Sequence, residues 1–145
     1  NINHLGLSNI CAKMWDATIL DKDAIEKADV VIADLPCSGL GIIGRKPDIK
    51  DKMNPEKIDA LVQLQRKILS TVTSYVKPNG VLIYSTCTIN KCENDDNVSW
   101  FMKNYSYQLI EPAIQIFPQH AAGHIQGGDG FYIARLQKRN GFTNN

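Results

Sequence analysis

The sequence predicts an α/β fold built around a mainly parallel sheet. Two apolar runs, Val30–Ala33 and Val81–Tyr84, have the length and composition of buried strands. The amphipathic pattern between them predicts a long helix, and a cysteine follows each run: Cys37 after the first and Cys87 after the second. Because strands alternate with helices, we expect right-handed crossovers and parallel strands.

Length and composition indicate one globular domain. The chain has 145 residues, of which 43% are hydrophobic and 21% are charged, enough for a sizeable core. Its apolar runs are too short to span a bilayer, and the polar start Asn1–His4 does not resemble a signal peptide. We therefore expect a cytoplasmic, reducing setting. The net charge of +1 provides no strong overall attraction for nucleic acid.

Short elements are expected before the first cysteine. Residues 1–8 have the pattern of a helix end, which Gly6 would stop. Residues 10–14 read as a short strand that leads into Trp15-Asp16-Ala17. A brief helix is expected over residues 22–28, and a buried strand over residues 29–34.

The clearest helix pattern begins at Pro55. Asn54 is a suitable N-cap, and a proline at the first helical position loses no hydrogen bond. From residue 58 to 76 the core-facing positions repeat every 3.6 residues and are apolar except for Gln65. The segment Lys77–Gly80 would end this helix.

One more helix and three strands are expected after residue 80. A strand over 81–86 precedes a helix from about Asn90, with Glu93 at the spacing of its capping partner. Strands over 107–110 and 131–136 could form an antiparallel edge.

The positions of the four cysteines favour chemistry over metal binding. No pair has the C-x-x-C spacing, and Cys87 and Cys92 are not at a usual zinc spacing, so we expect no metal site. Cys11, in a predicted strand, and Cys92, in a predicted helix, fit inert core thiols. Cys37 and Cys87 instead follow strand ends, where open α/β sheets form their ligand crevice. Covalent chemistry at an electrophilic ring fits these two thiols better than a structural role.

Charged residues flank the first of these two cysteines. Asp34 ends a strand that is expected to be buried, so its carboxylate would be partly desolvated and could share a proton with a heterocycle. It could equally cap the following turn. A basic cluster comes after the cysteine and is either a solvated surface or part of the crevice: Arg45, Lys46, Lys50 and Lys52.

These motifs together resemble the RNA cytosine-5 methyltransferases, and most of all the small-subunit ribosomal RNA methyltransferase B (Sun) type. The resemblance runs through nearly the whole chain and implies a Rossmann-like S-adenosylmethionine-dependent methyltransferase sheet. Asp34–Gly41, continuing through Arg45–Lys50, is similar to the family's Pro-Cys motif, and Tyr84–Thr88, followed by Glu93-Asn94, is similar to its Thr-Cys motif. Asp129–Leu136 resembles the closing strand, and Trp15–Ala17 resembles the acidic loop after the third strand.

The resemblance implies a role for each matching residue. Cys87 would add to carbon 6 of the target cytosine, which makes carbon 5 nucleophilic toward the methyl group of S-adenosylmethionine. Asp34 would hydrogen-bond or protonate ring nitrogen 3, and Cys37 would assist removal of the carbon 5 proton and release of the enzyme. Asp16 would contact the adenine end of the cofactor, with Asp34 also near it. The substrate would be RNA, ribosomal rather than transfer RNA. The target cytosine would have to leave its base stack to reach the active site. The RNA-binding residues would be Arg45, Lys46 and Lys50.

The chain departs from the family pattern in two features. A glycine-rich cofactor loop after the first strand and an acidic residue at the end of the second strand have no counterpart here. We therefore expect residues 1–145 to be the C-terminal portion of the catalytic domain, truncated at the N-terminus and without the first two strands. Such a sheet would expose an edge and could self-associate.

Two alternatives to this function stay open. The chain could be a non-catalytic RNA-binding or assembly module that keeps the methyltransferase fold. It could also be a thiol hydrolase, which would need a histidine partner: His4, His120 or His124.

Overall fold

The computed structural model describes residues 4, 6–118 and 128–139 and contains one mixed sheet with helices packed on it. Its strands are β1 (Ala28–Asp34), β2 (Val76–Thr86), β3 (Tyr107–Leu109), β4 (Ile114–Ile116) and β5 (Phe131–Lys138). Its α-helices are α1 (Ile49–Lys52), α2 (Pro55–Val72) and α3 (Asp95–Asn104). The described residues also contain four 3₁₀ turns: η1 (Lys22–Ala24), η2 (Leu40–Ile42), η3 (Thr73–Tyr75) and η4 (Lys91–Glu93).

The sheet combines one parallel pair with antiparallel neighbours. Its order is β1-β2-β5-β3, and β4 also pairs with β5. β1 and β2 run parallel, with Asp34 opposite Ser85 in register, whereas β5 is antiparallel to β2, β3 and β4. The expected parallel pair and the expected antiparallel pairing of the last strands are both observed. β4 was not predicted, because three residues are too few to show a period.

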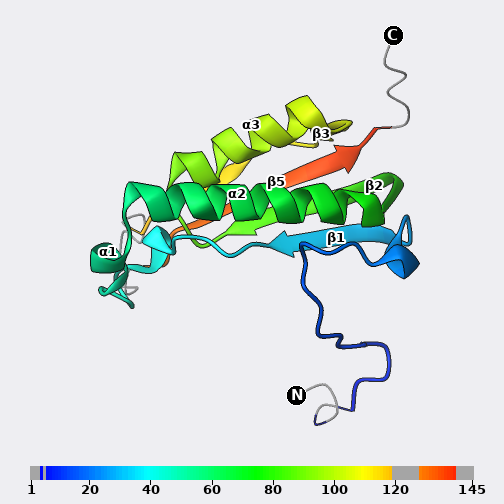
Figure 1. The fold of residues 1–145 in the computed structure, drawn as a ribbon, viewed down its shortest axis with the longest axis horizontal. Helices are drawn as coiled ribbons and strands as arrows, with labels where there is room; N and C mark the ends of the chain where they lie inside the picture. Colours follow the sequence, from blue (N-terminus) through cyan, green and yellow to red (C-terminus); the bar gives the residue numbers. More distant parts are fainter. Residues whose placement is uncertain (1–3, 5, 119–127, 140–145) are drawn as a thin grey trace.

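Helices α2 and α3 lie beside each other over the same face of the sheet (Figure 1). Helix α2 begins as the sequence predicts, because the Asn54 side chain accepts a hydrogen bond of 2.9 Å from the Lys57 backbone N–H and so acts as the N-cap. Both helices contribute to one core beneath them, with Leu69 of α2, Phe101 of α3 and Leu82 of β2 each at most 1% exposed. This packing holds the ends of β1 and β2 in place.

Strand β1 is less buried than its sequence suggests. Val30 and Ile32 are 53% and 69% exposed, while Ala33 is buried on the helix side. The prediction of a fully buried strand is therefore wrong for one face. Within the described residues β1 pairs with β2 alone and the helices cover one face of the sheet, so alternate side chains of β1 have nothing to pack on.

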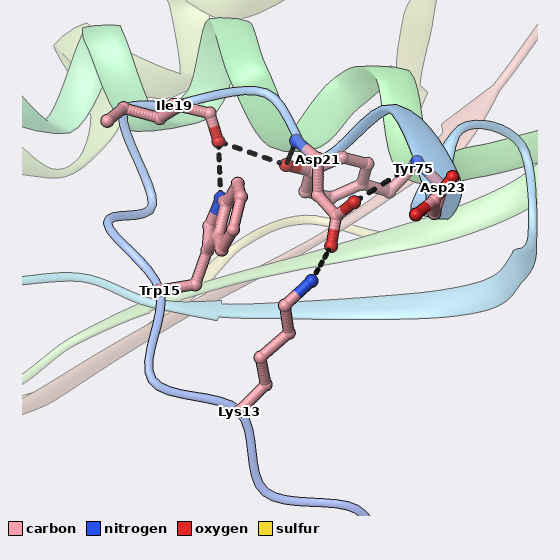
Figure 2. Close-up of polar contacts among 6 residues, drawn as sticks. All are labelled: Lys13, Trp15, Ile19, Asp21, Asp23 and Tyr75. Atoms are coloured by element: carbon pink, nitrogen blue, oxygen red, sulfur yellow. Dashed lines mark hydrogen bonds and ion pairs between the residues drawn. The ribbon is translucent and has the colours of Figure 1, made fainter.

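The strand predicted over residues 10–14 is also wrong. These residues are irregular and exposed, because their backbone finds no strand to pair with among the described residues. Side-chain contacts hold the segment instead (Figure 2): Lys13 pairs with Asp21 at 2.5 Å, and the Asp21 backbone N–H donates to the Tyr75 hydroxyl at 2.9 Å. The predicted helix over 22–28 is only the turn η1, and the predicted helix end over 1–8 lies largely outside the described residues.

Two predicted boundaries shift around the second cysteine motif. The segment Lys77–Gly80 was expected to end a helix but lies inside β2, where the pairing register jumps between Ala28 and Val30 of the neighbouring strand. Asn90 caps η4 rather than α3, since its side chain accepts from the Cys92 backbone N–H. The capping role predicted for Glu93 is therefore wrong, because its side chain turns into the protein interior.

Candidate active site

The two cysteines that follow β1 and β2 meet at one end of the sheet. The sulfur atoms of Cys37 and Cys87 lie 3.2 Å apart, and both residues are half-buried. The parallel pairing of β1 with β2 brings this about, because it sets their carboxyl ends side by side. The convergence expected from the sequence is confirmed.

The thiol of Cys37 is strongly biased toward its protonated form. Burial, followed by the hydrogen bond to Cys87 and the like charge of its sulfur, raises the pKa of Cys37 to about 12. Cys37 is therefore a neutral S–H group near pH 7. A protonated Cys37 can donate that hydrogen to the Cys87 sulfur.

A contact of three backbone segments fixes the loop that carries Cys87. The Gly41 N–H donates to the Cys87 carbonyl at 3.1 Å, and the Gly130 N–H donates to the Gly41 carbonyl at 2.7 Å. A Cβ at Gly41 would lie 2.4 Å from the Gly130 oxygen and 2.7 Å from the Cys87 oxygen. Only glycine fits at this approach, so residues 41, 87 and 130 are held as one unit.

Asp34 stands at the same end of the sheet, but it is exposed. The Ser85 hydroxyl donates to Asp34 Oδ1 at 3.0 Å across the β1–β2 pair. The partial desolvation expected from its place in the sequence is wrong, because β1 lies at the edge of the sheet in the described residues. The carboxylate is nonetheless available to a ligand.

Asp16 forms a local turn in the N-terminal segment. Its Oδ1 accepts hydrogen bonds of 2.8 Å from both the backbone N–H and the hydroxyl of Thr18, and these bonds lower the pKa of Asp16. Asp16 is therefore an exposed, ionised carboxylate, and its Oδ2 accepts no hydrogen bond from the residues that the structure describes.

The basic cluster divides into paired and free side chains. Arg45 forms an ion pair with Asp129, and Lys52 pairs with Asp48 at 2.6 Å. Lys46 and Lys50 are exposed and have no ion-pair partner among the described residues. Lys46 and Lys50 remain available to an anionic ligand, whereas Arg45 would have to leave Asp129.

The structure describes the other two cysteines and one of the three histidines. Cys11 and Cys92 are exposed free thiols, so the prediction that they are core thiols is wrong. His4 is exposed, and His120 and His124 lie outside the described residues. No group of three His, Cys, Asp or Glu side chains in the described part of the chain could hold a metal ion, and no helix there is long and apolar enough to cross a membrane.

Sequence reasoning missed the polar residues behind the cysteines. Ser38, Gln65, Glu93 and Asn97 are buried and hydrogen-bonded to one another just beneath the two cysteine loops. One signal was present in the sequence, because Gln65 is the polar member of an otherwise apolar helix stripe. A buried glutamine needs partners, and these partners come from three other segments.

Comparisons with known proteins identify the family. The family model described as 16S rRNA methyltransferase RsmB/F matches residues 1–137. Ribosomal RNA small subunit methyltransferase F of Serratia proteamaculans is 31% identical over 95% of this chain, and the probable ribosomal RNA small subunit methyltransferase B of Synechocystis sp. is 34% identical over 92%. The chain spans about a third of the length of these relatives, 31% and 33%.

Solved structures agree with the fold. A crystal structure of PH0851 superimposes with a TM-score of 0.79 and 30% identity, covering 94% of this chain and 33% of that one. A methyltransferase homolog protein from Pyrococcus horikoshii gives a TM-score of 0.77 at 22% identity, covering 94% of this chain and 47% of that one, which bears on the fold alone. The expected Rossmann-like S-adenosylmethionine-dependent methyltransferase sheet is confirmed. The chain belongs to the RsmB/F family of 16S rRNA methyltransferases.

Proposed function

We propose that this chain carries the catalytic cysteines of an S-adenosylmethionine-dependent methyltransferase that modifies carbon 5 of a cytosine in small-subunit ribosomal RNA. The observation that carries the proposal is the 3.2 Å separation of the Cys37 and Cys87 sulfurs beside the exposed Asp34 carboxylate. An aromatic carbon that is not activated needs a covalent partner before it accepts a methyl group. Residues 1–145 would then form the C-terminal portion of the catalytic domain.

Cys87 is the nucleophile in this scheme. Its sulfur forms a bond to carbon 6 of the cytosine, and the electron pair of the 5,6 double bond moves toward carbon 5 and the ring. When its carboxyl group is protonated, Asp34 donates a hydrogen bond or the proton to nitrogen 3 and stabilises that charge. When S-adenosylmethionine is bound, it supplies an electrophilic methyl group to carbon 5.

Cys37 acts after the adduct has formed. While Cys87 is free, its sulfur is one of the causes that raise the pKa of Cys37. Once Cys87 is a thioether it carries no charge, so that cause is removed and Cys37 ionises more readily. Cys37 then takes the carbon 5 proton, the 5,6 double bond re-forms, and the bond to Cys87 breaks with its electron pair returning to sulfur.

The residues of this chain that would hold the cofactor are the exposed carboxylates Asp16 and Asp34. Asp16 and Asp34 are acceptors, which fits the amino groups at the adenine and methionine ends of S-adenosylmethionine. Titration calorimetry of the cofactor into the 145-residue chain tests this, with Asp16→Asn expected to weaken binding. Equal affinity of Asp16→Asn and the parent chain would remove Asp16 from the cofactor site.

The covalent adduct provides the direct test of the function. In a complete methyltransferase domain that carries this chain, Cys37→Ala should accumulate a protein–RNA adduct that survives denaturing electrophoresis, because release is blocked. Adding Cys87→Ala should abolish the adduct. An adduct that persists without Cys87 would overturn the assignment of the nucleophile.

A non-catalytic RNA-binding module is the second candidate, supported by the exposed Lys46 and Lys50. It predicts RNA affinity that falls with salt and needs no cofactor. Filter binding with Lys46→Ala/Lys50→Ala should reduce both the affinity and the slope of its salt dependence. Methyl transfer to RNA by a complete methyltransferase domain that carries this chain would exclude a purely RNA-binding function.

A further inference from the structure

Glu93 is a buried carboxylate between the two cysteine loops. It lies at the end of η4 and is 0% exposed. Among the described residues no lysine or arginine forms an ion pair with it, and a carboxylate buried without a cation is costly unless hydrogen bonds satisfy its oxygens. The groups that donate hydrogen bonds to the two Glu93 oxygens therefore indicate its structural role.

Both oxygens of Glu93 bind residues that directly follow the cysteines. Oε1 accepts from the Ser38 backbone N–H at 2.8 Å, and Oε2 accepts from the Ser38 hydroxyl at 2.6 Å. Oε2 also accepts from the Thr88 hydroxyl at 3.4 Å, and the Ser38 and Thr88 hydroxyl oxygens are 2.8 Å apart. Ser38 follows Cys37, and Thr88 follows Cys87. One side chain thus connects the two loops one residue away from each sulfur.

A second layer of polar side chains orients Glu93 itself. The Gln65 amide donates to Glu93 Oε1 at 3.0 Å and to the Pro36 carbonyl at 2.9 Å. The Asn97 amide donates to Gln65 Oε1 at 2.7 Å, and its own oxygen accepts from Arg66 at 2.9 Å. Gln65 and Asn97 are both 0% exposed, so α2 and α3 present a rigid support for the carboxylate.

We propose that Glu93 is a positioning residue that holds the Cys37 and Cys87 sulfurs in contact through its hydrogen bonds to Ser38 and Thr88. The use of that contact in catalysis rests on the proposed function, but the contact itself does not. Removing the carboxylate would weaken the connection between the two loops, because only the Ser38–Thr88 hydroxyl contact, the Gly41–Cys87 hydrogen bond and the paired strands would still link them among the described residues.

Formation of a disulfide between the two cysteines measures the sulfur contact directly. Diamide, an azo oxidant, accepts two electrons and two protons from Cys37 and Cys87, which become a disulfide while the azo group becomes a hydrazine. The exposed Cys11 and Cys92 are first replaced by serine so that only one pair remains. The rate of ring closure is followed by peptide mass mapping and divided by the alkylation rate of the same thiols with iodoacetamide, which separates positioning from reactivity.

Glu93→Gln keeps the shape of the side chain but replaces an acceptor by a donor that faces other donors. We expect it to slow disulfide closure by at least about tenfold relative to alkylation, since small displacements of reacting groups cost that much or more. Val98→Ala, which opens the core of α3, is the control for general loss of stability, and it should leave the normalised closure rate unchanged. Closure in Glu93→Gln within twofold of the parent, or equal slowing in Val98→Ala, would overturn the proposal.

Ser38→Ala keeps the test decisive if Glu93→Gln does not fold. It removes the 2.6 Å donor and leaves the carboxylate, so closure should slow by less than in Glu93→Gln but by more than in Val98→Ala. An unchanged rate in a folded Ser38→Ala chain would overturn the proposal. The assay contains neither RNA nor S-adenosylmethionine, so its outcome is independent of whether the methyltransferase function is correct.

Discussion

Replacing Gly41 by alanine should damage both the stability of the chain and the Cys87 loop. The new Cβ would lie 2.4 Å from the Gly130 oxygen and 2.7 Å from the Cys87 oxygen, and ordinary contact begins at 3.4 Å. Both neighbours are backbone atoms of other segments, so neither can rotate away. The segments must separate by about 1 Å, which overpacked sites accommodate only at an energetic cost.

That separation breaks the hydrogen bonds that join the three segments. The Gly41 N–H loses the Cys87 carbonyl, at 3.1 Å, and the Gly130 N–H loses the Gly41 carbonyl, at 2.7 Å. With about 1 kcal/mol for each bond and a similar amount for overpacking, we expect the free energy of unfolding to fall by about 2–4 kcal/mol. For a chain of this length that lowers the melting temperature by roughly 6–16 °C.

Gly44→Ala provides a matched control in the same loop. A Cβ at Gly44 would meet nothing within 4 Å, so this variant should stay within about 0.5 kcal/mol of the parent. Urea denaturation followed by circular dichroism measures both variants. The close approach at Gly41 would be refuted if the free energies of unfolding of Gly41→Ala and Gly44→Ala differed by less than about 1 kcal/mol, which corresponds to about a fivefold difference in the equilibrium constant.

Three further predictions concern the cysteines, the long helix and the sheet edge. Because the pKa of Cys37 is raised to about 12, its alkylation by iodoacetamide should stay slow at pH 8 and rise steeply only above pH 10. Cys87→Ala should move that rise to lower pH, and a midpoint of the pH profile unchanged by Cys87→Ala would contradict the effect of Cys87 on Cys37. Asn54→Ala removes the N-cap of α2 and should lower the free energy of unfolding in urea by about 1 kcal/mol. We also propose that the chain self-associates through the exposed edge and face of β1, so that Ile32→Lys should shift the mass measured by analytical ultracentrifugation toward the monomer; a parent chain that sediments as a monomer at all concentrations would contradict it.

Local sequence determined the elements whose signals are complete within a few residues. Asn54 and Pro55 set the start of α2, and the apolar run Val81–Tyr84 identifies the centre of β2. The meeting of Cys37 and Cys87 also followed from the sequence, because a parallel pair of strands must bring its carboxyl ends to one edge of the sheet. The motifs likewise led to the RsmB/F family.

The tertiary structure alone decided which side chains are buried and what they contact. Residues 10–14 have a strand-like composition but find no partner strand in the described residues, and Ile32 has a core-like side chain on an uncovered face. Glu93 has the spacing of a helix cap, yet it is buried because Ser38 and Gln65, distant in sequence, supply its hydrogen bonds. Pairing and burial depend on partners far along the chain, and no local pattern encodes where those partners lie.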